Sequence, residues 1–109
     1  MRRWLGSLVG AGITIAAVGS FAANSLFEVS QQDRKFSVKR LQVAKGTTVN
    51  FKNLDPFFHN VFSVTPGSEF DLGAYPQGES KPVTFKKAGT VEVECALHPE
   101  MKMTVEVSE

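Results

Sequence analysis

The pattern that decides the fold class lies in residues 36–51, which read Phe36-Ser37-Val38-Lys39-Arg40-Leu41-Gln42-Val43-Ala44-Lys45-Gly46-Thr47-Thr48-Val49-Asn50-Phe51. Apolar and polar residues alternate over the first eight positions, as in a half-buried strand, but the alternation changes phase near Lys39 and Arg40. Such a change indicates a bulge or a strand that crosses between two sheets. After a turn at Lys45-Gly46, one face of the next strand carries Thr47, Val49 and Phe51. The stretch therefore predicts short strands joined by a tight turn.

Short strand candidates continue along the rest of the chain, at residues 60–65, 81–85, 90–94 and 104–107. Proline and glycine separate them, at Pro66-Gly67, Pro76, Gly78 and Ala88-Gly89. From residue 23 onward the chain has eleven Val and eight Phe but five Leu, a composition that suits pleated sheets. No stretch there shows an apolar period of 3.6 residues over three turns. These features predict an all-β fold, an antiparallel sandwich or barrel.

The segment 23–35 has less strand character, because it is polar and aperiodic after Val29. We interpret it as an N-terminal tail with a loose edge strand, and residues 36–109 as the single folded domain. The chain has 12 Lys and Arg against 11 Asp and Glu, and this balance argues against a nucleic-acid binder.

Residues 1–22 differ in composition from the rest, since Arg2-Arg3 supplies their only charges. Residues 4–18 are apolar or small almost throughout, and small residues stand at Ser20 and Ala22. This order is typical of a signal peptide, cleaved after Ala22, and predicts export to the periplasm. The alternatives are an uncleaved membrane anchor, for which the stretch is short, and a core helix, which its glycines disfavour. Cleavage removes two of the 12 basic side chains and leaves a formal charge of −1, which predicts weak long-range steering of partners.

The residues with metal-binding chemistry are few and gather around one segment, Cys95-Ala96-Leu97-His98-Pro99-Glu100-Met101-Lys102-Met103. Cys95 is the only cysteine, so in an exported protein it cannot form an internal disulfide. His98 and Met101 follow it at intervals of three residues, and the second histidine, His59, lies 36 residues upstream of Cys95 between two predicted strands. Two imidazoles, one thiolate and a weakly bound thioether make up the donor set of blue-copper electron-transfer centres.

Each of these residues also has an ordinary structural interpretation. Cys95 fits a small buried apolar position, His59 a hydrogen-bonded core position, and Met101 plain packing. A structural zinc site requires four closed ligands, for which thioether is a poor donor, and a Cys–His nucleophile lacks a third orienting group in this loop. Met103 is an alternative sulfur donor, but it lies in phase with Val105 and so fits a core-facing strand position. We therefore expect a copper site that uses Met101.

Three segments of the chain resemble the cupredoxins, copper proteins of the plastocyanin, pseudoazurin and amicyanin kind: residues 43–53, 55–63 and 95–101. Residues 70–73 and 75–76 add a likeness to small exported cupredoxin-domain proteins labelled methylamine-utilisation proteins. The resemblance implies a Greek-key β-sandwich that holds one copper ion and transfers single electrons.

Carried over by position, the resemblance implies three equatorial ligands and one axial ligand: His59, Cys95 and His98, with Met101 axial. Asn60, beside the first ligand, is expected to tie the two ligand loops together by hydrogen bonds. We expect the ring edge of His98 to reach the surface beside Leu97 and Pro99. His59 enters a strand and is expected to be the more buried ligand.

These expectations combine into a periplasmic carrier of single electrons that cycles between Cu(I) and Cu(II) and is not an enzyme. Its expected partners are redox proteins such as a c-type cytochrome or a periplasmic dehydrogenase; we expect no stable membrane insertion after cleavage and a monomer. The alternative is a copper carrier or storage protein that delivers copper to an apo-enzyme, which predicts an open, methionine-rich site. Copper oxidases and nitrite reductases need further copper centres, and therefore more than the two histidines of this chain.

Overall fold

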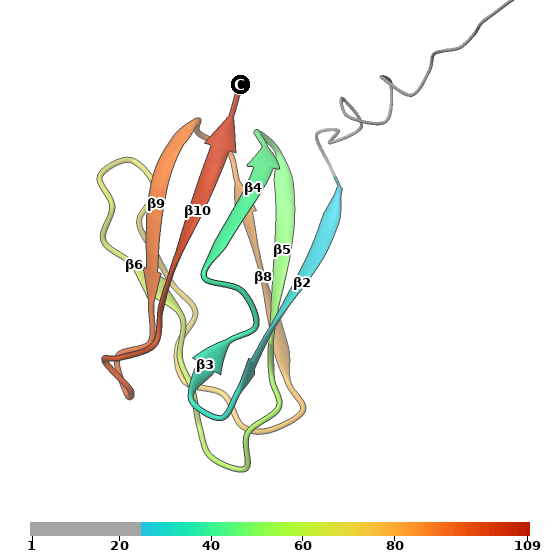
Figure 1. The fold of residues 1–109 in the computed structure, drawn as a ribbon, viewed down its shortest axis with the longest axis vertical. Coiled ribbons are helices and arrows are strands. Elements are labelled where there is room, and N and C mark those ends of the chain that lie inside the picture. Colours follow the sequence, from blue (N-terminus) through green and yellow to red (C-terminus); the bar gives the residue numbers. More distant parts are fainter. Residues whose placement is uncertain (1–24) are drawn as a thin grey trace, which may run out of the picture.

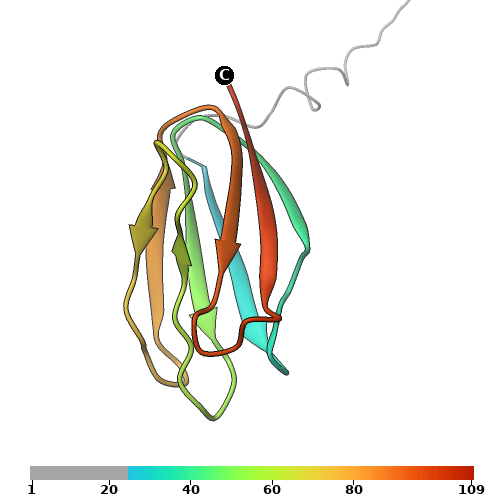
Figure 2. The ribbon, with the colours of Figure 1, turned by 90° about the vertical axis from the view of Figure 1, so that its left-hand side faces the viewer.

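The computed structural model of the protein describes residues 25–109, which form two β-sheets packed face to face (Figure 1 and Figure 2). One sheet has the strand order β4 (Arg40–Ala44), β10 (Lys102–Ser108), β9 (Gly89–Glu94), β6 (Phe62–Ser63) and β7 (Phe70–Asp71). The other has the order β3 (Lys35–Phe36), β2 (Leu26–Gln32), β5 (Thr47–Asn53) and β8 (Ser80–Phe85). Within residues 25–109, no helix is long and apolar enough to cross a membrane. The expected signal peptide, residues 1–22, lies outside the described residues, and its cleavage stays a prediction.

The expected all-β sandwich is confirmed, and the pairing of its strands is mixed rather than wholly antiparallel. β2 runs parallel to β5, and β4 runs parallel to β10, whereas the other pairs are antiparallel. The chain leaves β2, passes to the opposite sheet as β4 and returns beside β2 as β5, and such a crossover allows neighbouring strands to run in the same direction. Side chains alternate with a period of two in both kinds of pairing, so the sequence pattern does not distinguish them.

The change of phase near Lys39 marks the passage of the chain between the sheets. Phe36 ends β3 in one sheet, and β4 begins at Arg40 in the other. Residues 37–39 belong to no strand, and both Phe36 and Val43 are buried in the common core. Of the two possibilities that the sequence left open, a bulge or a crossing between sheets, the structure contains the crossing.

The core lies between the sheets and follows the alternation of the strands. In β5 every second side chain from Thr47 to Asn53 is buried, and in β10 the buried side chains are Met103, Val105 and Val107. Burying one large apolar side chain contributes roughly 1.5–3 kcal/mol to stability. The strand candidates at 81–85, 90–94 and 104–107 fall within β8, β9 and β10, whereas the candidate at 60–65 contracts to the two residues of β6.

The edge strand expected within residues 23–35 is β2, and it is a regular strand rather than a loose one. This strand pairs with β5 from Leu26 to Gln31 and is an edge only where the short β3 does not cover it. Val29 and Gln31 are both buried. Gln31 occupies a core position because its side-chain oxygen accepts a hydrogen bond from the hydroxyl of buried Tyr75 at 3.0 Å. Because Gln31 is polar and faces inward, the alternation of apolar and polar residues in β2 is not recognisable in the sequence.

Several connections meet at one end of the sandwich (Figure 1 and Figure 2): the turn at 33–34 and the loops 54–61, 72–79 and 95–101. The opposite end carries the turn at 45–46 and the connection at 86–88. The four expected ligands, His59, Cys95, His98 and Met101, and Asn60 lie on the loops at the first of these ends.

Candidate metal centre

Three metal-binding side chains converge at this end of the sandwich. Cys95 directly follows β9, His98 lies on the loop 95–101, and His59 lies on the loop between β5 and β6. The Sγ atom of Cys95 is 3.7 Å from Nδ1 of His59 and 3.9 Å from Nδ1 of His98. The ligand atoms of the three residues all lie within 4.8 Å of one another. The fold thus brings together two loops whose ligands, His59 and Cys95, lie 36 residues apart in sequence, and places one thiol and two imidazoles at a common point.

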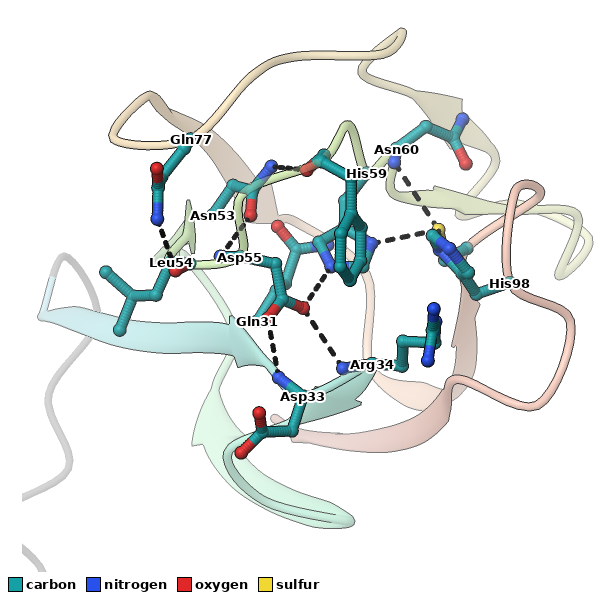
Figure 3. A network of polar contacts seen from close by, with 12 residues as sticks. Gln31, Asp33, Arg34, Asn53, Leu54, Asp55, His59, Asn60, Gln77 and His98 are labelled. Atoms are coloured by element: carbon teal, nitrogen blue, oxygen red, sulfur yellow. Dashed lines mark hydrogen bonds and ion pairs between the residues drawn. The ribbon is translucent and has the colours of Figure 1, made fainter.

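Asn60 joins the two loops that carry these side chains (Figure 3). Its backbone N–H points at the Cys95 sulfur at 3.4 Å, and its side-chain oxygen accepts a hydrogen bond from the N–H of Ala96 at 2.7 Å. Its side-chain amide donates to Asp71 at 3.1 Å. The hydrogen bond to its sulfur and the bond between Asn60 and Ala96 together hold Cys95 in position.

The ring of His59 is held from its far side by Asp55 (Figure 3). Nε2 of His59 is 2.7 Å from a carboxylate oxygen of Asp55, and both side chains are buried. A carboxylate accepts a hydrogen bond from Nε2–H, which leaves the lone pair of Nδ1 free and directed toward Cys95. The backbone of His59 also exchanges two hydrogen bonds with Tyr75, at 2.8 and 3.2 Å. His59 is therefore oriented before any metal binds.

Asp55 is a functional residue to which the sequence analysis assigned no role. Its two carboxylate oxygens accept hydrogen bonds from the backbone N–H groups of Asp33 at 2.7 Å and Arg34 at 3.0 Å. Burial alone raises the pKa of Asp55, but the hydrogen bonds with His59, Arg34 and Asp33 outweigh it, so that the pKa lies below the ordinary value. The turn that supplies the two N–H groups has positive φ at both residues, 56° and 57°. This uncommon backbone conformation aims both donors at one carboxylate.

An aromatic side chain covers the two histidines. The ring of Phe57 lies 5.3 Å from the ring of His59 and 5.2 Å from that of His98, and the two imidazoles are 4.9 Å apart. The guanidinium of Arg34 lies over the same Phe57 ring, 5.0 Å from its centre. A cation on the face of an aromatic ring is attracted by the ring quadrupole, so Arg34 holds Phe57 against the site.

The sulfur donor closest to Cys95 in strand register is that of Met101. β9 and β10 pair Glu94 with Lys102 and Val93 with Met103. If this antiparallel register is continued by one residue, Met101 lies opposite Cys95. Its carbonyl accepts a hydrogen bond from the Cys95 N–H at 3.3 Å. Residues that face each other on antiparallel strands project from the same side of the sheet. Met103 faces Val93 instead and is part of the buried row of β10, as the sequence pattern predicts.

The two histidines differ in exposure in the way the sequence predicts. His59 is fully buried, whereas His98 is half-buried. Leu97, beside His98, has half of its surface exposed, 51%, and Pro99 is also exposed. His98 therefore offers the most direct contact between the donor cluster and the surface.

The donor set fits copper. A thiolate and a thioether favour the reduced ion, and imidazole suits both oxidation states, whereas a structural zinc site rarely accepts thioether. The nearest buried carboxylate, that of Asp55, is hydrogen-bonded to Nε2 of His59, on the side of the ring away from Cys95. It is therefore not one of the donors, which are sulfur and nitrogen atoms.

Comparison with known proteins gives the same family. The model of the copper binding proteins of the plastocyanin/azurin family matches residues 23–108. A reduced mutant of amicyanin is 27% identical, with a TM-score of 0.71 over 80% of this chain and 86% of that chain. A purple cupredoxin from Nitrosopumilus maritimus shares the fold at 22% identity, with a TM-score of 0.67 over 75% of this chain and 99% of that chain.

A Cu-containing nitrite reductase from Thermus scotoductus SA-01 is 29% identical with a TM-score of 0.71 over 76% of this chain, but the chain spans only 22% of its length. A search of curated proteins finds no match. The expected resemblance and the expected cofactor, copper, are confirmed by the family match, which covers most of the chain. The chain belongs to the plastocyanin/azurin family of copper-binding proteins, the cupredoxins.

Proposed function

We propose that His59, Cys95, His98 and Met101 hold one copper ion and that the protein carries single electrons between redox partners. The observation that carries this proposal is the convergence of one thiol and two imidazole nitrogens within 4.8 Å, with one of the two histidines, His98, only partly buried. Bound copper supplies the one-electron chemistry, by alternating between Cu(I) and Cu(II). The family of the chain supports the same function.

The protein's own contribution is to hold the ligands still. Cys95 is bound by hydrogen bonds from Asn60 and to Met101, and His59 by Asp55 and Tyr75. Ligands that are fixed by such partners keep the same arrangement in both oxidation states, which limits the rearrangement that accompanies each electron. Cys95 acts as a thiolate, because a coordinating thiol is deprotonated.

Electrons are exchanged through the edge of His98. Its two chain neighbours give the surface beside it an apolar character, since Leu97 is 51% exposed and Pro99 is also exposed. Such a surface allows a partner to approach closely without desolvating charges. The partners are redox proteins, such as a c-type cytochrome or a periplasmic dehydrogenase. The alternative of a copper carrier predicts an open site, whereas His59, Cys95 and Met101 are each at most 1% exposed.

The place of action is the periplasm, reached through the signal peptide at residues 1–22. The test is mass spectrometry of the periplasmic fraction, which should find a chain that begins at Ala23. A full-length product in the membrane fraction would support an uncleaved anchor instead.

The direct test of the site is a titration of the metal-free protein with Cu(II). The wild type should bind one copper per chain and turn intensely blue, and Cys95→Ser should remove the colour because a hydroxyl does not replace the soft donor. The matched control is Val93→Ala, which disturbs the core two residues earlier on β9 and keeps every donor. It should lose stability and stay blue. A wild type that binds zinc but forms no blue copper complex would refute the assignment.

A further inference from the structure

A groove of about 440 Å³ lies beside the metal site, between the turn at 33–34 and the end of the loop 95–101. Four positively charged side chains line it: Arg34, Lys35, Lys39 and Lys102. Two carboxylates, Asp33 and Glu100, also line the groove, so that it keeps a surplus of positive charge. These cations come from the turn at 33–34, β3, the crossing at 37–39 and the start of β10, which the fold brings together.

The four cations present their charge at the surface. All four are exposed, and none of them takes part in an ion pair within residues 25–109. Arg40, which follows Lys39 directly, differs from them because it is paired with Glu106. Unpaired charges that lie close together produce a local field that is larger than the net charge of the chain suggests.

The groove is in direct contact with the metal site. Met101, which faces Cys95, is one of its lining residues. Arg34 lies over Phe57, and Phe57 packs on the ring of His98 (Figure 3 shows Arg34 and His98). A partner seated over the groove therefore also reaches the apolar surface beside His98.

We infer that this groove is the electrostatic half of the docking surface, and that it fits a redox protein whose contact face is acidic. The inference rests on the proposed function and names the chemistry of its partner. The occupant is a protein rather than a small anion, because the cations are exposed, lie on separate segments and surround no buried polar group that would complete an anion pocket. The weak steering expected from the formal charge of −1 is replaced by strong steering toward this one face.

The test compares two double variants with the same change in net charge. Lys35→Glu with Lys39→Glu reverses two charges at the groove, and Lys86→Glu with Lys87→Glu reverses two at the opposite end of the sandwich. Each copper-loaded protein is mixed in a stopped-flow instrument with two c-type cytochromes, one acidic and one basic around the exposed haem edge. The rate constant is measured at ionic strengths of about 10 mM and about 200 mM, between which screening becomes strong.

With the acidic cytochrome, the wild-type rate constant should fall steeply as salt is added. The groove variant should react at least roughly tenfold more slowly at low salt and show little salt dependence, whereas the distal variant should stay within about twofold of wild type. A second measurement uses both proteins in the reduced state, so that no reaction occurs. Titration of the isotope-labelled protein with the acidic cytochrome should then shift the amide signals of residues 33–39 and 97–102.

Equal effects of the two double variants would overturn the inference, because net charge alone would then explain them. A faster reaction of the wild type with the basic cytochrome would overturn it as well. Neither result affects the proposed function, which requires only a blue spectrum and electron exchange. Both variants should keep the visible spectrum of the wild type, and a wild type that is not blue would instead refute the copper site.

Discussion

Replacing Asp55 with asparagine tests whether a buried carboxylate orients the first histidine of the site. The carboxylate accepts backbone hydrogen bonds from Asp33 and Arg34 at 2.7 and 3.0 Å and pairs with Nε2 of His59 at 2.7 Å. An amide has one accepting oxygen and no charge, so at least one of the three bonds is lost and the others weaken. A hydrogen bond to a charged group contributes about 1.5–3 kcal/mol.

We therefore expect Asp55→Asn to lower the free energy of unfolding of the metal-free protein by about 2–3 kcal/mol. For a domain of this size the melting temperature should fall by roughly 10–20 °C. Because His59 is less firmly oriented, the affinity for copper should fall by roughly 10- to 100-fold. Urea unfolding followed by circular dichroism measures the first quantity, and competition with a copper chelator measures the last.

The matched control is Asp33→Asn, which removes the same charge from the neighbouring turn. No hydrogen bond or ion pair of the described residues involves the Asp33 carboxylate, and asparagine tolerates its positive φ of 56°. This variant should change the free energy of unfolding by less than about 0.5 kcal/mol. Equal stabilities and equal copper affinities of the two variants would refute the role of Asp55.

Three further outcomes follow from the site. Met101→Gln should keep the blue colour and shift the reduction potential, which voltammetry measures. Met103→Leu should leave the potential unchanged and lower the stability by under about 1.5 kcal/mol, which thermal unfolding measures. The reverse pattern would make Met103 the axial ligand. Asn60→Ala removes the 2.7 Å bond from Ala96 and should destabilise the protein by roughly 1–2 kcal/mol and move the visible absorption band, which an unshifted spectrum would contradict. Leu97→Glu keeps every ligand but places a charge on the apolar surface beside His98, so electron self-exchange should slow; an unchanged rate would exclude docking at this edge.

The candidate donors could be identified from the sequence because metal chemistry is carried by residue type. A chain with two histidines and one cysteine has few ways to build a sulfur and nitrogen site. The choice of Met101 over Met103 also had a local basis, since Met103 continues the alternation of Val105. The structure adds the register that places Met101 opposite Cys95.

Apart from Asn60, which the resemblance implies and which joins the two ligand loops, the partners of these donors could not be identified in the same way. Asp55 precedes a proline in a loop and has the appearance of an ordinary turn residue, yet its oxygens meet N–H groups 21 and 22 residues away. Gln31 interrupts an apolar pattern, yet it is buried against Tyr75, 44 residues away. Hydrogen bonds between distant segments leave no periodicity in the sequence, so no local pattern reveals them.

The sequence by itself determined the all-β class, the change of strand phase near Lys39 and the chemistry of the donors, because strand alternation and ligand type are properties of neighbouring residues. Only the tertiary structure decided that strands pair in mixed directions, that Asp55 orients His59, and that four separate cations border the site. The physical reason is that these features depend on which segments become neighbours in space. Which segments become neighbours depends on the burial of the whole apolar core, and a short stretch of sequence does not specify it.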